Sequence, residues 1–406
     1  MGKALKTTAS GQSEWVGLRS RAKLRLALAG LSIILGLSLS TVSAQEPGAA
    51  IRVLHSSQET RFPGAVNFTL TAEGEADIVE VRLRYRIVGD EIWSSAYPGF
   101  NPGRLVTASL DLSVGESVYL PPGAELEYFY VIRDALGHVH RTPPAVTEYV
   151  DSRFHWERTQ TGSLLLLHHE LRPSRVAATA LKVGAALNHI GSLLGWEAGR
   201  PIKGVLYNSD AEAQDAFPSQ SQAMAEAHVF RGFSFPFHGV FVGVGFQTAL
   251  IVHEAAHLLL DQAVRPDALP LPAWLDEGFA TYIQSGTRPY VGSVLSSAGL
   301  PLAAMAKVPE TPQSITTFYR KSESVVAYLI DEYGVESFQQ LVGGLAQGQT
   351  AENALVGTYG FGTSELEARW ASDIRLSPAP VPAPPAGRDP WEAFGATLII
   401  VLSIVG

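Results

Sequence analysis

Two histidines and a glutamate at close spacing offer the clearest chemistry in this chain of 406 residues. His253, Glu254 and His257 form the pattern HExxH within the mostly apolar segment TALIVHEAAHLLLDQ. In a helix, residues four positions apart lie on the same face, so the two imidazoles can bind one zinc ion. Glu254 can then reach a water on that ion and act as the general base. The segment predicts a metal site that activates water.

A catalytic zinc site needs a third protein ligand, and the segment WLDEGFATY supplies a candidate. Glu277 follows His257 by twenty residues. This interval allows one helix to end, a loop to turn and a second helix to bring a carboxylate back. Gly278, beside it, would let two helices approach closely. Asp261 could orient an imidazole from one turn beyond His257, although an exposed acid at a helix end is the simpler interpretation.

Together, HEAAH and WLDEGFATY resemble the gluzincin metallopeptidases, which are HExxH zinc peptidases with a downstream glutamate ligand. The likeness is strongest to the peptidase MA-like branch and covers roughly residues 160–376. It implies a thermolysin-like catalytic domain that binds Zn²⁺ through His253, His257 and Glu277, with Glu254 as the base.

The downstream sequence resembles the gluzincin helix that carries a transition-state tyrosine, which implies this role for Tyr319. Ser322 stands where the gluzincin aminopeptidases have glycine, and a core tyrosine is the alternative. Residues 237–244 (FHGVFVGV) lack the Gly-x-Met-x-Asn segment with which those aminopeptidases hold a free amine. We therefore expect an endopeptidase rather than an aminopeptidase.

The elements that must position these residues change in character near residue 152. From 45 to 151, short alternating runs separated by turns predict an antiparallel, immunoglobulin-like β-sandwich. From 152 to 376, buried β runs are followed by helices, as expected for the peptidase domain. The predicted fold class is therefore α+β, with a β-sandwich before a thermolysin-like domain whose C-terminal part is helical. The predicted strands are 66–70, 79–87, 105–112, 126–132, 164–167, 202–206 and 240–244. The predicted helices are 175–194, 248–263, 273–284, 319–333 and 364–374.

Both ends of the chain have the composition of membrane or targeting segments. Residues 1–44 combine a basic stretch, an apolar run and a small-residue site, as in a signal peptide, although an uncleaved anchor helix is the alternative. Residues 377–390 are a Pro/Ala-rich linker, and the apolar segment 391–406 is expected to anchor the chain in a membrane. That segment is short for a full span, so a truncated anchor, partial insertion or a docked helix all remain open.

The composition excludes several classes of function. The chain has no cysteine, so disulfides, thiolate metal sites and cysteine nucleophiles are absent. Its net charge is −9, which is unfavourable for binding a nucleic acid backbone. A globular core is well supported, since 46% of the residues are hydrophobic.

These observations predict an exported zinc peptidase, secreted or held at the cell surface, that acts on peptides or proteins. One alternative is a zinc-binding but inactive surface scaffold, against which the retention of Glu254 argues. The other is a metal-free adhesion protein, against which the joint occurrence of HEAAH and LDEGFA argues.

Overall fold

The computed structural model describes residues 50–114, 119–196, 199–218, 231–264, 269–285, 299–309 and 311–376. The predicted signal peptide, the Pro/Ala-rich linker and the apolar C-terminal segment lie outside these residues. Within the described ranges, no helix combines the length and hydrophobicity needed to cross a membrane.

The first part, which we call the β region, consists of seven antiparallel strands connected through one long strand, β2 (Ala65–Ile87). The first half of β2 pairs with β1 and β4, and the second half pairs with β3 and β5. β6 and β7 pair with β5. The other strands are β1 (Ile51–Arg61), β3 (Ser94–Ala96), β4 (Gly103–Ser113), β5 (Glu125–Asp134), β6 (Val139–Arg141) and β7 (Ala145–Glu148).

Alternation of buried and outward side chains explains why β2 is continuous. The sequence predicts two strands here, at 66–70 and 79–87, and the structure corrects this to one. Ala72 and Ile78 remain buried between the two predicted runs, and the two-residue period shifts by one position only after Ile78, where the pairing with β5 has an irregularity. The region is therefore β-rich as expected, while its immunoglobulin-like form stays a prediction.

The second part, which we call the mixed region, contains a five-stranded sheet in the order β11-β12-β10-β9-β8. β9, β10 and β12 are parallel, and the edge strands β8 and β11 run antiparallel to their neighbours. The sequence predicts the three apolar inner strands but not the edges, because ERTQT and GFSF are polar or glycine-containing. The strands are β8 (Glu157–Thr161), β9 (Leu164–His168), β10 (Ile202–Tyr207), β11 (Gly232–Phe235) and β12 (Val240–Val244).

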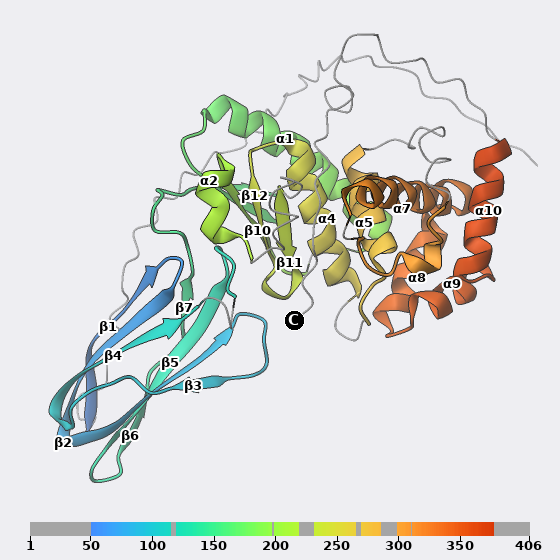
Figure 1. Ribbon diagram of the computed structural model, residues 1–406. Helices are drawn as coiled ribbons and strands as arrows, with labels where there is room; N and C mark the ends of the chain where they lie inside the picture. Colours follow the sequence, from blue (N-terminus) through green and yellow to red (C-terminus); the bar gives the residue numbers. More distant parts are fainter. Residues whose placement is uncertain are drawn as a thin grey trace, which may run out of the picture. The chain divides into compact units, whose positions relative to one another are not determined.

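Helices pack on this sheet and continue beyond it to the end of the described chain (Figure 1). α4 contacts β10, β11 and β12, as well as α1 and α5. α7 packs on α5, and the last three helices follow α7. The helices are α1 (Pro173–Leu194), α2 (Asp210–Ala213), α4 (Thr248–Val264), α5 (Ala273–Ser285), α7 (Pro312–Tyr333), α8 (Val335–Ala346), α9 (Ala351–Tyr359) and α10 (Thr363–Leu376).

Local signals set several helix ends. Gly195 and Gly360 adopt left-handed conformations, with φ of 62° and 80°, and end α1 and α9. Thr350 accepts a hydrogen bond from the backbone N–H of Asn353 at the start of α9. α7 begins at Pro312, earlier than the predicted 319, while α8 and α9 have no predicted counterpart.

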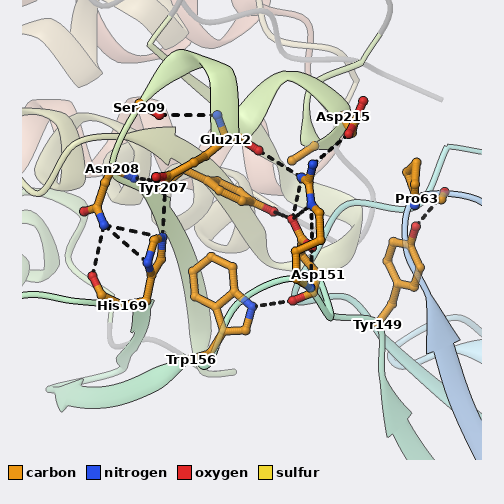
Figure 2. Close-up of polar contacts among 12 residues, drawn as sticks. Pro63, Tyr149, Asp151, Trp156, His169, Tyr207, Asn208, Ser209, Glu212 and Asp215 are labelled. Atoms are coloured by element: carbon orange, nitrogen blue, oxygen red, sulfur yellow. Dashed lines mark hydrogen bonds and ion pairs between the residues drawn. The ribbon is translucent and has the colours of Figure 1, made fainter.

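A buried polar network lies where the β region continues into the mixed region (Figure 2). The fully buried carboxylate of Asp151 accepts hydrogen bonds from Tyr207 at 3.1 Å and from Arg153 at 2.7 Å. Arg153 also contacts Asp215 at 2.8 Å, and the indole N–H of Trp156 donates to the Asp151 carbonyl. The carboxylate is therefore compensated by hydrogen bonds and by the guanidinium charge.

Lys203 of β10 makes a second connection. Its ammonium group donates to the carbonyl of Gly123 at 3.0 Å and to Glu125 at 2.9 Å, and it also pairs with Glu148. Lys203 and Tyr207 are four positions apart in β10, and residues an even number apart lie on the same face of a strand. Contacts to residues of the β region, or directly after it, therefore cover that face and help to bury all six residues of β10.

Candidate metal centre

α4 carries the HExxH residues in one of the most buried parts of the molecule. His253 and Glu254 have no exposed surface, and His257 is 1% exposed. All residues from Leu250 to Leu260 are buried, since the helix packs on the sheet and on α1, α5 and α8. The apolar sequence of the helix explains this burial, while the three polar residues need partners to offset their desolvation.

Three ligand atoms converge between α4 and α5. Nε2 of His253 and Nε2 of His257 are 3.2 Å apart, and Oε2 of Glu277 lies 3.6 Å and 3.4 Å from them. A tetrahedral zinc ion with ligand bonds of about 2.0–2.1 Å holds neighbouring ligand atoms roughly 3.3–3.4 Å apart. The predicted metal residues therefore lie together with the spacing that zinc requires, and they form the candidate metal cluster of the described residues.

Asp276 provides a contact that the sequence analysis did not predict. Its Oδ1 lies 2.8 Å from Nδ1 of His257, which leaves Nε2 of that ring directed at the other ligand atoms. Burial alone would lower the pKa of His257, but Asp276 and Glu277 raise it well above its usual value. The sequence analysis considered Asp261 for this role, whereas the structure places Asp276 at Nδ1 of His257.

Glu254 has the environment of a base held out of water. Neither carboxylate oxygen has a hydrogen-bond partner within the described residues, and both are buried. Burial raises the pKa of this carboxyl well above its usual value, His257 opposes the shift, and Glu277 adds to it. A Cβ atom at Gly232 would lie 2.1 Å from Oε1 of Glu254. Glycine in β11 is thus required for the carboxylate to lie against the strand.

Close packing between α5 and α7 fixes the position of the third ligand. A Cβ atom at Gly278 would lie 2.5 Å from the carbonyl oxygen of Ser322. The predicted purpose of Gly278 is therefore confirmed, with α7 as the helix that approaches it. Because Gly278 follows Glu277 directly, this contact holds the ligand near α4.

Tyr319 lies on α7, one turn before Ser322, and is 1% exposed. Residues three and seven positions apart share a helix face, so Tyr319, Ser322 and Val326 lie on the side that packs on α5. This places the residue on the face next to the helix of Glu277, but it does not assign a catalytic role, which stays a prediction.

The segment without the amine-binding motif is not at the edge of the described sheet. Residues 240–244 form β12, which lies inside the sheet, and β11 occupies the edge. The strand that lacks the amine-binding motif is therefore an inner strand of the described sheet and not its edge. Residues 219–230, which lead to β11, are outside the described residues.

Comparison with known families finds one match. Residues 183–375 match the model of the Peptidase MA superfamily. This range contains α4, α5 and α7, and thus every residue of the candidate metal centre. No curated protein matches the chain.

Solved structures of zinc peptidases show weak overall similarity. A two-domain M1 zinc metallopeptidase bound to L-arginine has 12% identity and a TM-score of 0.37, over 82% of this chain and 97% of the other. An M1 zinc metallopeptidase from Deinococcus radiodurans has 12% identity and a TM-score of 0.34, over 82% and 96%. An aminopeptidase N family protein from Idiomarina loihiensis has 10% identity and a TM-score of 0.37, over 76% and 73%.

These TM-scores are low, so the assignment depends on the family match together with the geometry of the ligand atoms. Residues 183–375 are similar to the Peptidase MA superfamily, and with this arrangement of ligand atoms the chain is a zinc metallopeptidase of the gluzincin type.

Proposed function

We propose that the protein hydrolyses peptide bonds at a zinc ion held by His253, His257 and Glu277, with Glu254 as the general base. The observation that carries this proposal is the separation of the three ligand atoms, 3.2–3.6 Å, which is close to the edge of a zinc tetrahedron. Zinc supplies Lewis acidity toward water and the scissile carbonyl.

Glu254 would accept a proton from the attacking water and later deliver it to the leaving amine. Its raised pKa suits this exchange, because a base is most effective when its pKa lies near the working pH. The carboxylate has no competing hydrogen bond within the described residues, which leaves both oxygens available to water.

Tyr319 would donate a hydrogen bond to the oxyanion that forms at the carbonyl. Support comes from its place on the face of α7 that packs on α5. A donor fixed by a buried helix needs little reorganisation when charge develops on the substrate.

We favour an endopeptidase that binds its substrate along β11. An extended peptide can pair with the edge strand of a sheet, and β11, whose four residues are buried, is the edge strand of the described sheet that contacts the helix carrying Glu254. The described strand, GFSF, has no carboxylate to hold a free α-amine. Peptides with free and acetylated N-termini should therefore be cleaved at similar rates. A strict need for the free amine would show an aminopeptidase.

Hydrolysis of a mixed quenched-peptide library by the full chain tests the proposed reaction. Glu254→Gln should retain zinc and lose activity by roughly 10²–10⁴-fold, because the amide cannot accept the proton. Glu365→Gln changes an exposed residue of α10 and is the matched control, with native activity expected. Zinc without cleavage by any form would favour the inactive scaffold.

The remaining expectations concern the organisation and location of the chain. We propose a β-sandwich domain at 45–151 and a peptidase domain at 152–376, supported by two separate clusters of buried hydrophobic residues. We also propose export by residues 1–44 and membrane attachment by 391–406, supported by composition alone. Fractionation of cells that express the full chain or a version without 391–406 tests both.

A further inference from the structure

One face of the β region carries a regular row of arginines. Arg82, Arg84 and Arg86 occupy alternate positions of β2, so their side chains lie on the same side of the strand. The neighbouring strands add two more arginines, which share this side by their register. We define the arginine face by Arg82, Arg84, Arg86, Arg133 and Arg141.

Aromatic rings hold two of these guanidinium groups in place. Arg141 lies over the ring of Phe129 at 3.9 Å, and Arg86 lies over the ring of Trp93 at 4.5 Å. The two rings pack edge to face at 4.8 Å. Cation–π contacts of this kind restrict the side chains. The polar edge of Arg86 already donates to Glu127 and to the Asp90 carbonyl, whereas that of Arg141 has no such contact among the described residues.

The face carries more positive than negative charge. Glu80 pairs with Arg82 at 3.8 Å and Arg133 at 3.2 Å, and Glu127 pairs with Arg86 at 2.7 Å. Five arginines against two glutamates leave an excess of three positive charges.

Arg84 and Arg141 have no carboxylate partner among the described residues, and Nε of Arg84 has no hydrogen-bond partner there. Arg141 is exposed and Arg84 is partly exposed. On a chain with a net charge of −9, this face is therefore suited to an acidic partner.

The spacing of the row narrows the choice of partner. Alternate side chains of a strand repeat at roughly 6.8 Å, and an extended polypeptide presents its own alternate side chains at the same repeat. A segment with Asp or Glu at every second position can therefore place successive carboxylates opposite Arg82, Arg84 and Arg86. Guanidinium groups bind carboxylates through paired hydrogen bonds.

We propose that the arginine face is an exosite that binds extended acidic segments of polypeptides, and that such polypeptides are the substrate class of the peptidase. The second clause rests on the proposed function, whereas binding itself does not. The face lies on β2, β5 and β6, which contribute none of the metal-site residues.

Fluorescence anisotropy with the full-length Glu254→Gln form tests binding without hydrolysis. The probes are a labelled peptide of alternating Glu and Thr, and a peptide of the same composition with all Glu in one block. The alternating peptide should bind more tightly. Adding Arg84→Gln and Arg141→Gln together should weaken its binding about tenfold, since two charge-assisted contacts are removed.

Matched variants separate binding from folding. Arg52→Gln removes an exposed arginine of β1 that pairs with Glu73, and it should leave the affinity unchanged. Arg84→Lys with Arg141→Lys keeps both charges and should retain most of the binding even if the Gln pair is unstable. Equal binding of the two peptides, or native affinity in a folded Gln variant, would overturn the proposal. Tighter binding of an acidic polysaccharide that is lost in the same variant would also overturn it.

Kinetics test the link to the peptidase. A quenched substrate extended by the alternating segment should have a lower KM than the same substrate without it. This advantage should disappear in the Arg84→Gln, Arg141→Gln form while kcat stays native. An equal KM for both substrates would overturn the exosite as a substrate site. Absence of all hydrolysis, with peptide binding intact, would instead contradict the proposed function and leave the binding surface standing.

Discussion

Asp276 shows how one side chain outside the ligand set can control the metal site. Its contact of 2.8 Å with Nδ1 of His257 fixes the ring that faces the other ligands. Asp276→Asn keeps the shape but weakens the acceptor, so zinc affinity should fall about 10- to 100-fold. Competition with a chromophoric chelator measures the change. Asp261→Asn is the control, and equal losses in both variants would contradict the role of Asp276.

Sequence spacing predicted the candidate ligand residues that the structure brings together, because HExxH is a local pattern on one helix and Glu277 lies in a distinctive segment. It was not sufficient for Asp276, since that contact depends on how α5 crosses α4. From helical period, Asp261 was the residue considered as a partner for His257, with an exposed acid at a helix end as the simpler interpretation. The way in which α5 packs against α4 determines which acid contacts His257, and this packing cannot be predicted from a single sequence.

At the scale of elements, the close approach of α5 and α7 is expected to be sensitive to one methyl group. Gly278→Ala would place a Cβ atom 2.5 Å from the backbone of Ser322, which must then move. The free energy of unfolding should fall by about 1–3 kcal/mol, with some loss of zinc affinity. Urea unfolding measures the first effect, and chelator competition the second.

Gly343 of α8 is the matched control for this substitution. A Cβ atom there meets nothing within 4 Å, so Gly343→Ala should leave stability unchanged or raise it by about 0.5–1 kcal/mol. Equal destabilisation by both substitutions would mean that helix packing at Gly278 is unimportant.

Glu323 of α7 is expected to make stability depend on pH. Burial raises the pKa of its carboxyl from 4.5 to about 7, although a hydrogen bond from Ser285 and the charge of Arg320 lower the pKa in part. The stability contributed by the neutral form is complete below about pH 4.5 and is lost as pH rises through 7. At pH 8 the loss approaches about 3 kcal/mol.

Glu323→Gln should therefore stabilise the protein at pH 8 and change little at pH 4. Urea unfolding of both forms at the two pH values provides the measurement, with Glu365→Gln as an exposed control. A gain of the same size at both pH values would contradict a titrating carboxyl at this position.

At the scale of the whole molecule, Lys203 connects the β region to the sheet of the mixed region. Replacing it with Met leaves Glu125 and Glu148 without this cation and removes a donor from the Gly123 carbonyl. Lys203→Met should lower the unfolding temperature, because it removes a buried ammonium group that donates to three partners, although Glu148 keeps its ion pair with Arg158. Lys182→Met, at an exposed site on α1, should not. Identical unfolding temperatures would show that Lys203 contributes little to the connection.

The general organisation followed from the sequence, with alternating β runs first and helices later. The details that depend on contacts between residues distant in sequence could not be predicted in this way. β8 and β11 were missed because edge strands need not be apolar, and these two edges set the width of the sheet. β2 was predicted as two strands, at 66–70 and 79–87, whereas pairing with β1 as far as Gly74 and with β4 at Glu73 and Ile78 makes it one strand.

The most direct test of the central claim is the zinc content of the purified full chain and of two variants. Elemental analysis should find about one zinc ion per chain in the native protein and in Glu254→Gln, because the base is not a ligand. Glu277→Gln should contain much less, since the third ligand is lost. A native chain without zinc, or full zinc content in Glu277→Gln, would contradict the assignment of the metal centre.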